Sequence, residues 1–202
     1  EKAFCAGGDV SDFQPDAGML ALHHRRGDFA ELLLDMHRFP RPIVGRINGQ
    51  ALGGGFGLAL NCDVSIAAST ATFGTPEIKL GLFPMMIMAV IVRNIGRKAA
   101  MELMLTAERI DADRALALGC INRIAAPEEL DDAVAALAGK IASFSPAVLR
   151  LGREAFYETQ DMSFAQSLRT LHNELTINAM SEDAAEGVIA FMSKRPPEWK
   201  GR

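Results

Sequence analysis

The sequence predicts an α/β fold in which a parallel β/α core is followed by an α-helical C-terminal region. Two observations carry this prediction: a strand, glycine turn, helix and strand succeed one another in the first half, and helical periodicity dominates from Pro84 onward. Parallel strands need long crossover connections, usually helices, so the first pattern favours a parallel sheet. We place the core at residues 1–138 and the helical region at residues 139–202.

The core prediction rests on two short apolar segments, residues 42–48 and residues 63–68, which we expect to be buried strands. A glycine-rich turn at residues 49–55 separates the first strand from the apolar segment 56–62, which we expect to be helical. This order is typical of parallel β/α architecture.

Helix start and stop signals define the second half. Asp111 is a predicted N-cap for a helix at residues 112–118, and Gly119 follows as the residue that ends it. Ser145 and Pro146 stand in the order expected at a helix start. Further helical periodicity covers residues 151–157, 164–179 and 184–192.

Composition limits the partners. The net charge is -4 and long basic stretches are missing, so the sequence predicts no nucleic-acid partner. The longest apolar run, residues 82–92, contains Pro84 and is too short to span a bilayer, so no membrane partner is expected. The three cysteines form no Cys-x-x-Cys motif, which favours a reducing, cytoplasm-like compartment without a metal site. Because the chain opens at Glu1 and runs straight into a motif, we expect that its natural N-terminal part is missing.

Several familiar catalytic sites are excluded by their motifs. The sequence has no Gly-x-Gly-x-x-Gly, no P-loop lysine motif, no His-Glu-x-x-His and no Gly-x-Ser-x-Gly. His23 and His24 stand beside Arg25 and Arg26, and we interpret this group as an exposed polar loop rather than a catalytic one.

Two glycine-containing turns, residues 4–9 and residues 52–56, remain as candidates. Glycine allows a backbone N–H to approach a ligand without a side chain in the way. Two such amides converging on one oxygen form an oxyanion hole, in which each donor is worth about 10²–10³ in rate. Two ordinary tight turns are the alternative interpretation.

Glu77 lies in a largely apolar segment, residues 74–81. Apolar surroundings disfavour the charged form of a carboxylate, which makes it a better proton carrier near neutral pH. The alternative is a surface glutamate that pairs with Lys79 or caps a helix.

These features occur within motifs that resemble those of the crotonase (enoyl-CoA hydratase/isomerase) family, in the family's order and over essentially the whole chain. The similar motifs are Lys2-Ala-Phe-Cys-Ala-Gly-Gly-Asp9, Asn48-Gly-Gln-Ala-Leu-Gly-Gly-Gly55, Cys62-Asp63, Phe73-Gly-Thr-Pro-Glu-Ile-Lys-Leu-Gly81, Leu105-Thr-Ala-Glu-Arg-Ile-Asp-Ala112 and Phe191-Met-Ser-Lys-Arg-Pro-Pro-Glu-Trp-Lys200. Only the set as a whole is specific.

The resemblance implies a fold and a set of roles. The fold is a spiral of β-β-α turns with an α-helical C-terminal trimerisation region, assembled as trimers or dimers of trimers. Gly8 and Gly54 would supply the oxyanion-hole amides, and the backbone of Ala6 would contact the CoA adenine. Trp199 and Lys200 match an aromatic residue and a lysine that approach the CoA from a neighbouring subunit, where the ammonium suits a phosphate.

One departure from the family pattern directs the prediction of chemistry. Hydratases of this family hold water between two glutamates; the second matches Glu77, but the first position holds Gly57. The family's glycine-rich stretch is also replaced by the bulky residues 85–88, which predict either a more apolar wall or core packing. We therefore expect Glu77 to move a proton from the α- to the γ-carbon of a 3-enoyl-CoA, a Δ3-Δ2 isomerisation. It requires no metal or redox cofactor, and coenzyme A enters as part of the acyl-CoA substrate.

Two alternatives stay open besides other chemistries of the family, such as decarboxylation or thioester hydrolysis. One is an enoyl-CoA hydratase in which another group replaces the missing glutamate. The other is a non-catalytic homologue that binds acyl-CoA.

Overall fold

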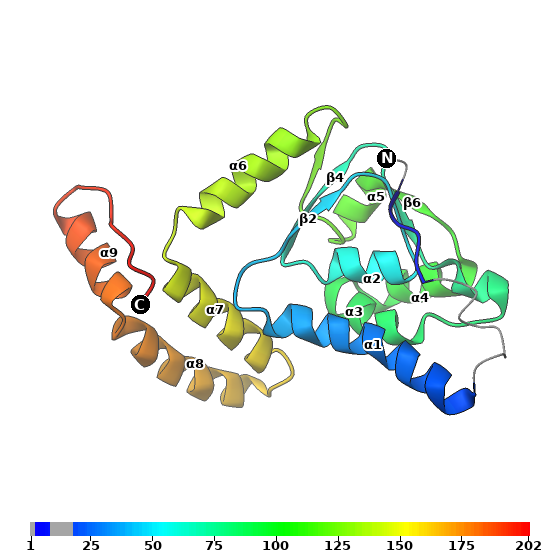
Figure 1. Cartoon of the computed structure of the whole chain (residues 1–202), viewed down its shortest axis with the longest axis horizontal. Coiled ribbons are helices and arrows are strands. Elements are labelled where there is room, and N and C mark those ends of the chain that lie inside the picture. Colours follow the sequence, from blue (N-terminus) through cyan, green and yellow to red (C-terminus); the bar gives the residue numbers. More distant parts are fainter. Residues whose placement is uncertain (1–2, 9–17) are drawn as a thin grey trace. The chain divides into compact units, whose positions relative to one another are not determined.

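The computed structural model describes residues 3–8 and 18–202 (Figure 1). They form two compact units: the first holds the described residues up to Met36 and residues 43–135, and the second holds residues 37–42 and 136–202. The division lies three residues before the predicted one at residue 138. Residues 37–42, which the prediction placed in the core, belong to the helical unit.

The first unit is built from β-β-α turns. The first complete turn consists of β2 (Val44–Ile47), β3 (Gln50–Leu52) and α2 (Gly54–Leu60). The next consists of β4 (Val64–Ala68), β5 (Thr72–Gly74), the short 3-10 helix η2 (Pro76–Leu80) and α3 (Met85–Asn94). In each turn the first strand joins one sheet and the second strand joins another, so the chain advances as a spiral.

The two sheets have the strand orders β1-β3-β5-β6 and β2-β4-β7. Their remaining strands are β1 (Ala3–Cys5), β6 (Ile110–Asp111) and β7 (Arg123–Ala125). Every pairing is parallel except that of β5 with β6. Strands β6 and β7 contradict the expectation of an almost purely helical chain after Pro84. They have only two and three residues, which is too short to show a period-two pattern in the sequence.

Helix α1 (Met19–Arg38) occupies the region where the sequence predicted an exposed polar loop. Its sequence is rich in polar residues and only Leu33 is buried, so it carries no clear apolar stripe. His23 and His24 lie exposed on this helix and not in a loop.

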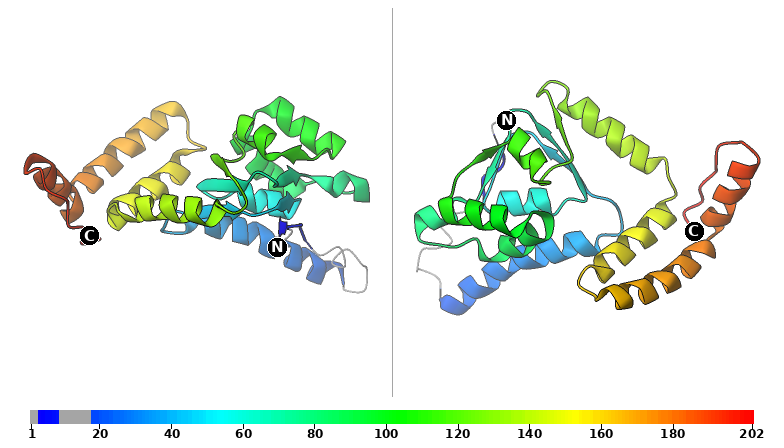
Figure 2. Two further views of the ribbon diagram at one scale, coloured as in Figure 1. Left: turned by 90° about the horizontal axis from the view of Figure 1, so that it is seen from above. Right: turned by 180° about the vertical axis from the view of Figure 1, so that it is seen from behind.

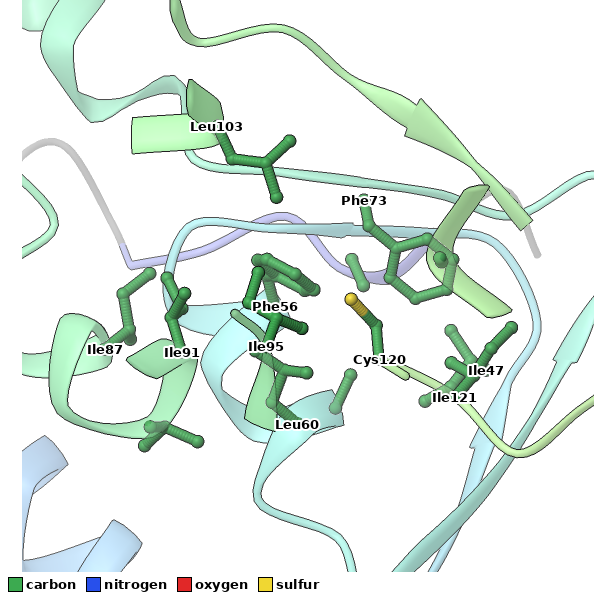
Figure 3. Close-up of a cluster of buried hydrophobic side chains, with 14 of the residues drawn as sticks. Ile47, Phe56, Leu60, Phe73, Ile87, Ile91, Ile95, Leu103, Cys120 and Ile121 are labelled. Carbon is green, nitrogen blue, oxygen red and sulfur yellow. The ribbon is translucent and has the colours of Figure 1, made fainter. Parts of the chain in front are cut away.

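The hydrophobic core of the first unit lies where α2, α3 and the strands meet (Figure 3). The rings of Phe56 and Phe73 lie 5.9 Å apart at its centre, and both residues are fully buried. Ile91 of α3 and Met104 of α4 (Arg97–Thr106) belong to the same buried cluster and are contributed by the helices. Burying such side chains contributes about 1.5–3 kcal/mol each.

The predicted caps are confirmed. Asp111 Oδ1 accepts a hydrogen bond of 2.8 Å from the backbone N–H of Arg114 at the start of α5 (Ala112–Ala117). Gly119 follows that helix with φ 81°, a conformation that favours glycine. Ser145 Oγ likewise accepts from the N–H of Val148 at 3.1 Å.

The second unit consists of the end of α6 (Leu130–Ala142), α7 (Pro146–Thr159), α8 (Phe164–Ala179) and α9 (Glu182–Met192), which follow one another in Figure 2. The buried Arg153 of α7 donates to the backbone carbonyls of His37, at 2.7 Å, and of Phe39. Its guanidinium lies 4.7 Å from the Tyr157 ring centre, on which the His37 ring also stacks. These contacts explain why residues 37–42 belong to this unit. In the described chain, no single helix is both long and apolar enough to cross a membrane.

Candidate active site

The candidate site forms where three neighbouring strands of the larger sheet end. The strands β1, β3 and β5 are adjacent and parallel, with Cys5 paired to Ala51 and Leu52 paired to Gly74. Their carboxyl ends therefore meet at one edge of the sheet. The loops that follow carry the predicted residues Gly8, Gly54 and Glu77, which sequence separation alone would not bring together.

The first two of these loops are in direct contact. A Cβ atom added at Gly55 would lie 2.1 Å from the carbonyl oxygen of Cys5, so only glycine fits there. A Cβ added at Gly7 would lie 3.2 Å from the Leu52 carbonyl oxygen and 3.7 Å from the backbone nitrogen of Gly54. Gly7 also has φ 105°, which L side chains rarely adopt. The backbone that precedes Gly8 is thus packed against the backbone that presents Gly54.

The amide of Gly54 has the position of an unpaired helix-start donor. Gly54 is the first residue of α2, and the first N–H groups of a helix have no intrahelical acceptor. Three nearby amides are occupied: Gly53 donates to the Gly74 carbonyl at 2.9 Å, and Phe56 and Gly57 donate to the Gly53 carbonyl. Gly8 is exposed, with open space around the position of an added Cβ. The convergence of the two amides on one oxygen stays a prediction.

Glu77 approaches the same turn. Its Oε1 atom lies 2.9 Å from where a Cβ on Gly53 would stand, and Gly53 has φ 54°. A side chain at Gly53 is therefore excluded both by backbone conformation and by the carboxylate. The Oε2 atom of Glu77 is buried and has no hydrogen-bond partner among the residues that the structure describes. Burial raises the pKa of Glu77, and a hydrogen bond from its own backbone N–H opposes this only in part.

The alternative roles of Glu77 find no support in the geometry. The N-cap of η2 is Thr75, not Glu77, and no side chain caps that helix. In the described part of the chain, no ion pair joins Glu77 to Lys79. A half-buried carboxylate with a raised pKa, next to a glycine turn, is a chemically competent proton carrier.

Gly57 lies one helical turn beyond the N-cap residue Gly53, and its surroundings decide whether a side chain could stand at position 57. A Cβ added at Gly57 would lie 2.4 Å from Cγ2 of Ile87 and 3.0 Å from its Cβ. Ile87 of α3 is almost fully buried (Figure 3). No side chain can therefore occupy position 57 unless α3 or Ile87 moves. The sequence pointed to residues 85–88 as bulky replacements but did not single out Ile87.

Core packing, one of the two roles expected for that segment, is shown by one of its methionines, whereas an apolar wall at the site stays a prediction. Met85 and Met86 are exposed, whereas Met88 packs against the core. Phe29 of α1 is a site residue that the sequence did not indicate. Its Cζ atom lies 3.4 Å from where a Cβ on Gly54 would stand, so an aromatic ring covers this glycine.

The C-terminal segment, residues 199–201, is held by hydrogen bonds to other residues of the second unit. The buried carboxylate of Asp183 accepts hydrogen bonds from Ser145 Oγ at 2.5 Å and from the backbone N–H groups of Lys200 and Gly201 at 2.7 and 3.0 Å. The Ser145 hydroxyl is the main cause that lowers the pKa of Asp183, and the two amides add to it. The indole N–H of Trp199 donates to the Ser143 carbonyl at 2.8 Å. Trp199 therefore has a structural role within this chain.

The basic residues of the tail are largely engaged by acids of α9. Arg195 forms a bidentate pair with Glu186, at 2.6 and 2.8 Å, which lowers the pKa of Glu186 to about 2. The ammonium of Lys200 lies 3.9 Å from a Glu182 oxygen and is exposed, so it can reach another partner. Contact of Trp199, Lys200 or the exposed Ala6 with CoA stays a prediction.

Comparison with known proteins gives one consistent answer. The profile of the enoyl-CoA hydratase/isomerase family matches residues 1–202. The chain is 36% identical over 203 residues to a probable enoyl-CoA hydratase of Rhizobium meliloti, covering 100% of this chain and 78% of that protein. It is 32% identical over 202 residues to the 2,3-dehydroadipyl-CoA hydratase of Escherichia coli, with the same coverage.

Solved structures agree. The crystal structure of an enoyl-CoA hydratase from Mycobacterium smegmatis is similar with a TM-score of 0.94 and 34% identity, covering 98% of this chain and 77% of that one. An enoyl-CoA hydratase from Bacillus anthracis gives a TM-score of 0.93 and 32% identity, covering 100% and 78%. The likeness therefore extends to the spiral fold as well as to the motifs.

Proposed function

Given that the chain belongs to the enoyl-CoA hydratase/isomerase family, whose members act on acyl-CoA substrates, we propose that it is a Δ3-Δ2 enoyl-CoA isomerase that uses Glu77 as its only acid-base carboxylate. The observation that carries the proposal is the contact between Gly57 and Ile87. A methyl group stands where a second side chain facing the site would have to begin. Glu77 is then left to perform the proton chemistry alone.

The reaction follows from the parts of the site. The carboxylate of Glu77 removes a proton from C2 of a 3-enoyl-CoA, and the electrons of the broken C–H bond delocalise over the diene and the thioester oxygen. Backbone N–H groups of Gly8 and Gly54 hold the negative oxygen. Glu77 then returns the proton to C4, the thioester carbonyl re-forms, and the double bond lies between C2 and C3. Each proton leaves and returns through the same oxygen atoms, so atoms and charge balance.

The raised pKa of Glu77 suits both half-reactions. A carboxylate that is reluctant to stay charged takes the proton more readily, and the acid that results holds the proton for delivery to C4. Because Gly53 has no side chain, the Glu77 carboxylate has room to lie beside the turn that presents the Gly54 amide.

Hydration of a 2-enoyl-CoA is the second candidate, because the relatives from Rhizobium meliloti and Escherichia coli are named as hydratases. In this chain the reaction would need a water held by a group other than a side chain at residue 57. Glu77 would take a proton from that water as the water oxygen attacks C3, and would deliver a proton to C2, so that one water is added across the double bond.

One assay separates these candidates. The purified protein is given 3-enoyl-CoA and 2-enoyl-CoA in parallel. Hydration is followed by mass, since it adds one water, and isomerisation is followed by the ultraviolet absorbance of the conjugated 2-enoyl thioester, since it leaves the mass unchanged. We expect turnover of 3-enoyl-CoA with little hydration of 2-enoyl-CoA. Faster hydration would establish the hydratase, and a lack of turnover and of proton exchange in D₂O would indicate a non-catalytic acyl-CoA-binding protein.

We also propose that the helical unit mediates assembly into homotrimers or dimers of trimers. The support is an apolar stripe on α8 in which Phe164, Leu168, Leu171 and Leu175 recur at helical spacing, all exposed by 39–80%. In such an assembly Lys200 could reach the CoA of a neighbouring copy. Analytical ultracentrifugation of the wild type and of Leu168→Glu tests the stripe: the variant should dissociate, and an unchanged sedimentation coefficient would contradict the proposal.

A further inference from the structure

The contact between α2 and α3 has a second consequence, which concerns water. Gly53 is the N-cap residue of α2, and the amide of Gly57 donates to its carbonyl at 3.1 Å. This hydrogen bond places Gly57 one helical turn beyond Gly53. The carboxylate of Glu77 lies against the N-cap glycine, and Cγ2 of Ile87 lies against the other.

The side chain of Ile87 thus forms an apolar wall one turn from the proton carrier. Ile87 is 3% exposed and belongs to the hydrophobic core, so its methyl groups face protein on nearly all sides. The methyl groups of Ile87 and the Cα atom of Gly57 offer a water molecule no hydrogen-bond partners, and apolar surroundings of this kind stay dry. The buried Oε2 atom of Glu77, without a hydrogen-bond partner in the described chain, is consistent with a carboxylate on the dry side of this wall.

We infer that Ile87 is the residue that determines the fate of the proton: it keeps water from the Glu77 carboxyl group, so that the proton taken from C2 is returned to C4 before it exchanges with solvent. This inference rests on the proposed isomerase function and adds a specificity-determining residue to it. Exclusion of water also protects the dienolate from side reactions. Ile87 acts through Glu77 and the surrounding space, so it is a positioning residue and not a catalytic one.

The chemistry gives a readout that a merely structural role would not move. A 3-enoyl-CoA carrying deuterium at C2 is isomerised in ordinary water. Glu77 takes up the deuteron as the C2–D bond breaks, and the deuteron either forms the new bond at C4 or is replaced by a proton from water. The fraction of product that carries deuterium at C4 measures this partition, independently of how much active protein is present.

Ile87→Thr and Ile87→Val form a matched pair, because threonine and valine have nearly the same shape. Valine keeps methyl groups against Gly57, whereas threonine places a hydroxyl group there that can hold a water molecule. We expect the wild type and Ile87→Val to retain the label at C4, and Ile87→Thr to lose most of it to solvent. Ile87→Ser, which also places a hydroxyl group there on a smaller side chain, provides a second way to admit water should Ile87→Thr not fold.

The outcomes separate the two proposals. If the wild type does not isomerise 3-enoyl-CoA, the proposed function is wrong and the inference with it. If the wild type isomerises the substrate but all folded variants retain the label equally, or if the wild type itself retains none, the proposed function stands and the role of Ile87 is refuted. Loss of label in Ile87→Thr or Ile87→Ser, with retention in Ile87→Val, supports it.

Discussion

Replacing Gly57 by alanine sets two effects against each other, and the structure decides which is larger. Inside a helix such as α2, alanine is favoured over glycine by about 1 kcal/mol. The added methyl, however, would lie 2.4 Å from Cγ2 of Ile87, well inside van der Waals contact. Overpacking of a buried site costs about 1–3 kcal/mol, and so close a contact belongs to the upper part of that range. We expect Gly57→Ala to lower the free energy of unfolding by about 1–2 kcal/mol.

Removing the opposing methyl should reverse that sign. Ile87→Ala alone costs about 2–5 kcal/mol because it leaves a cavity in the core. In that background the nearest remaining atom to an alanine at position 57 is the Cβ of residue 87, at 3.0 Å. The helix propensity of alanine then dominates, and Gly57→Ala should become neutral or stabilising by up to about 1 kcal/mol. The two substitutions should therefore couple by about 2 kcal/mol, beyond the scatter of about 0.5 kcal/mol seen for independent sites.

Urea denaturation of the four proteins in this cycle measures the coupling. Circular dichroism should be the probe, because the single tryptophan, Trp199, reports on the helical unit and not on α2. Additive effects within about 0.5 kcal/mol would refute the reasoning. So would a wild-type background in which Gly57→Ala stabilises the protein by its full helix propensity.

Three further predictions concern the site and the tail. Glu77→Gln should lower the rate of isomerisation by about 10²–10⁴. In a pH–rate profile, the wild-type rate should fall as the pH drops through the raised pKa of Glu77, and the variant should lack this dependence. Because that pKa is higher in the folded than in the unfolded protein, stability should fall as pH rises through the window between the two values, and denaturation at several pH values should show no such fall for Glu77→Gln. Gly54→Pro deletes one N–H donor at a helix position that tolerates proline, so kcat should fall by about 10²–10³. Gly54→Ala keeps the N–H and should stay closer to the wild type. Equal losses of kcat in both variants would argue against an oxyanion role for this amide. Asp183→Asn should weaken the attachment of the tail and expose residues 194–202 to proteolysis. Because hydrogen bonds lower the pKa of Asp183, the wild-type tail should itself be released as the pH falls through that lowered pKa.

The sequence was sufficient for the features that local chemistry dictates. Asp111 and Ser145 cap helices as expected, because an N-cap is defined by a side chain and the amides two or three residues on. The strand at residues 63–68 was likewise evident as a short apolar segment, and the helix at residues 164–179 from apolar positions that recur at helical spacing.

The sequence was insufficient where structure depends on distant contacts. Strands β6 and β7 are only two or three residues long, and their extended conformation comes from pairing with β5 and β4. Helix α1 buries only Leu33, so its sequence carries no stripe to reveal it. Residues 37–42 join the helical unit through Arg153, a partner more than a hundred residues away.

The candidate site shows the same division. Glycine turns and a lone glutamate were evident as residues, and the motifs placed them in a family. Their shared edge follows only from the parallel pairing of β1, β3 and β5. The contact of Ile87 with Gly57, 30 positions apart in the chain, could not be derived from either residue alone.

The central claim is that main-chain amides of Gly8 and Gly54 hold the thioester oxygen while Glu77 faces the α-carbon. A crystal structure of Glu77→Gln with a 3-enoyl-CoA bound tests this most directly. We predict the thioester oxygen about 2.7–3.1 Å from both backbone nitrogens, with the amide of residue 77 beside C2. A thioester oxygen that contacts neither nitrogen, or a residue 77 side chain turned away from C2, would contradict the account.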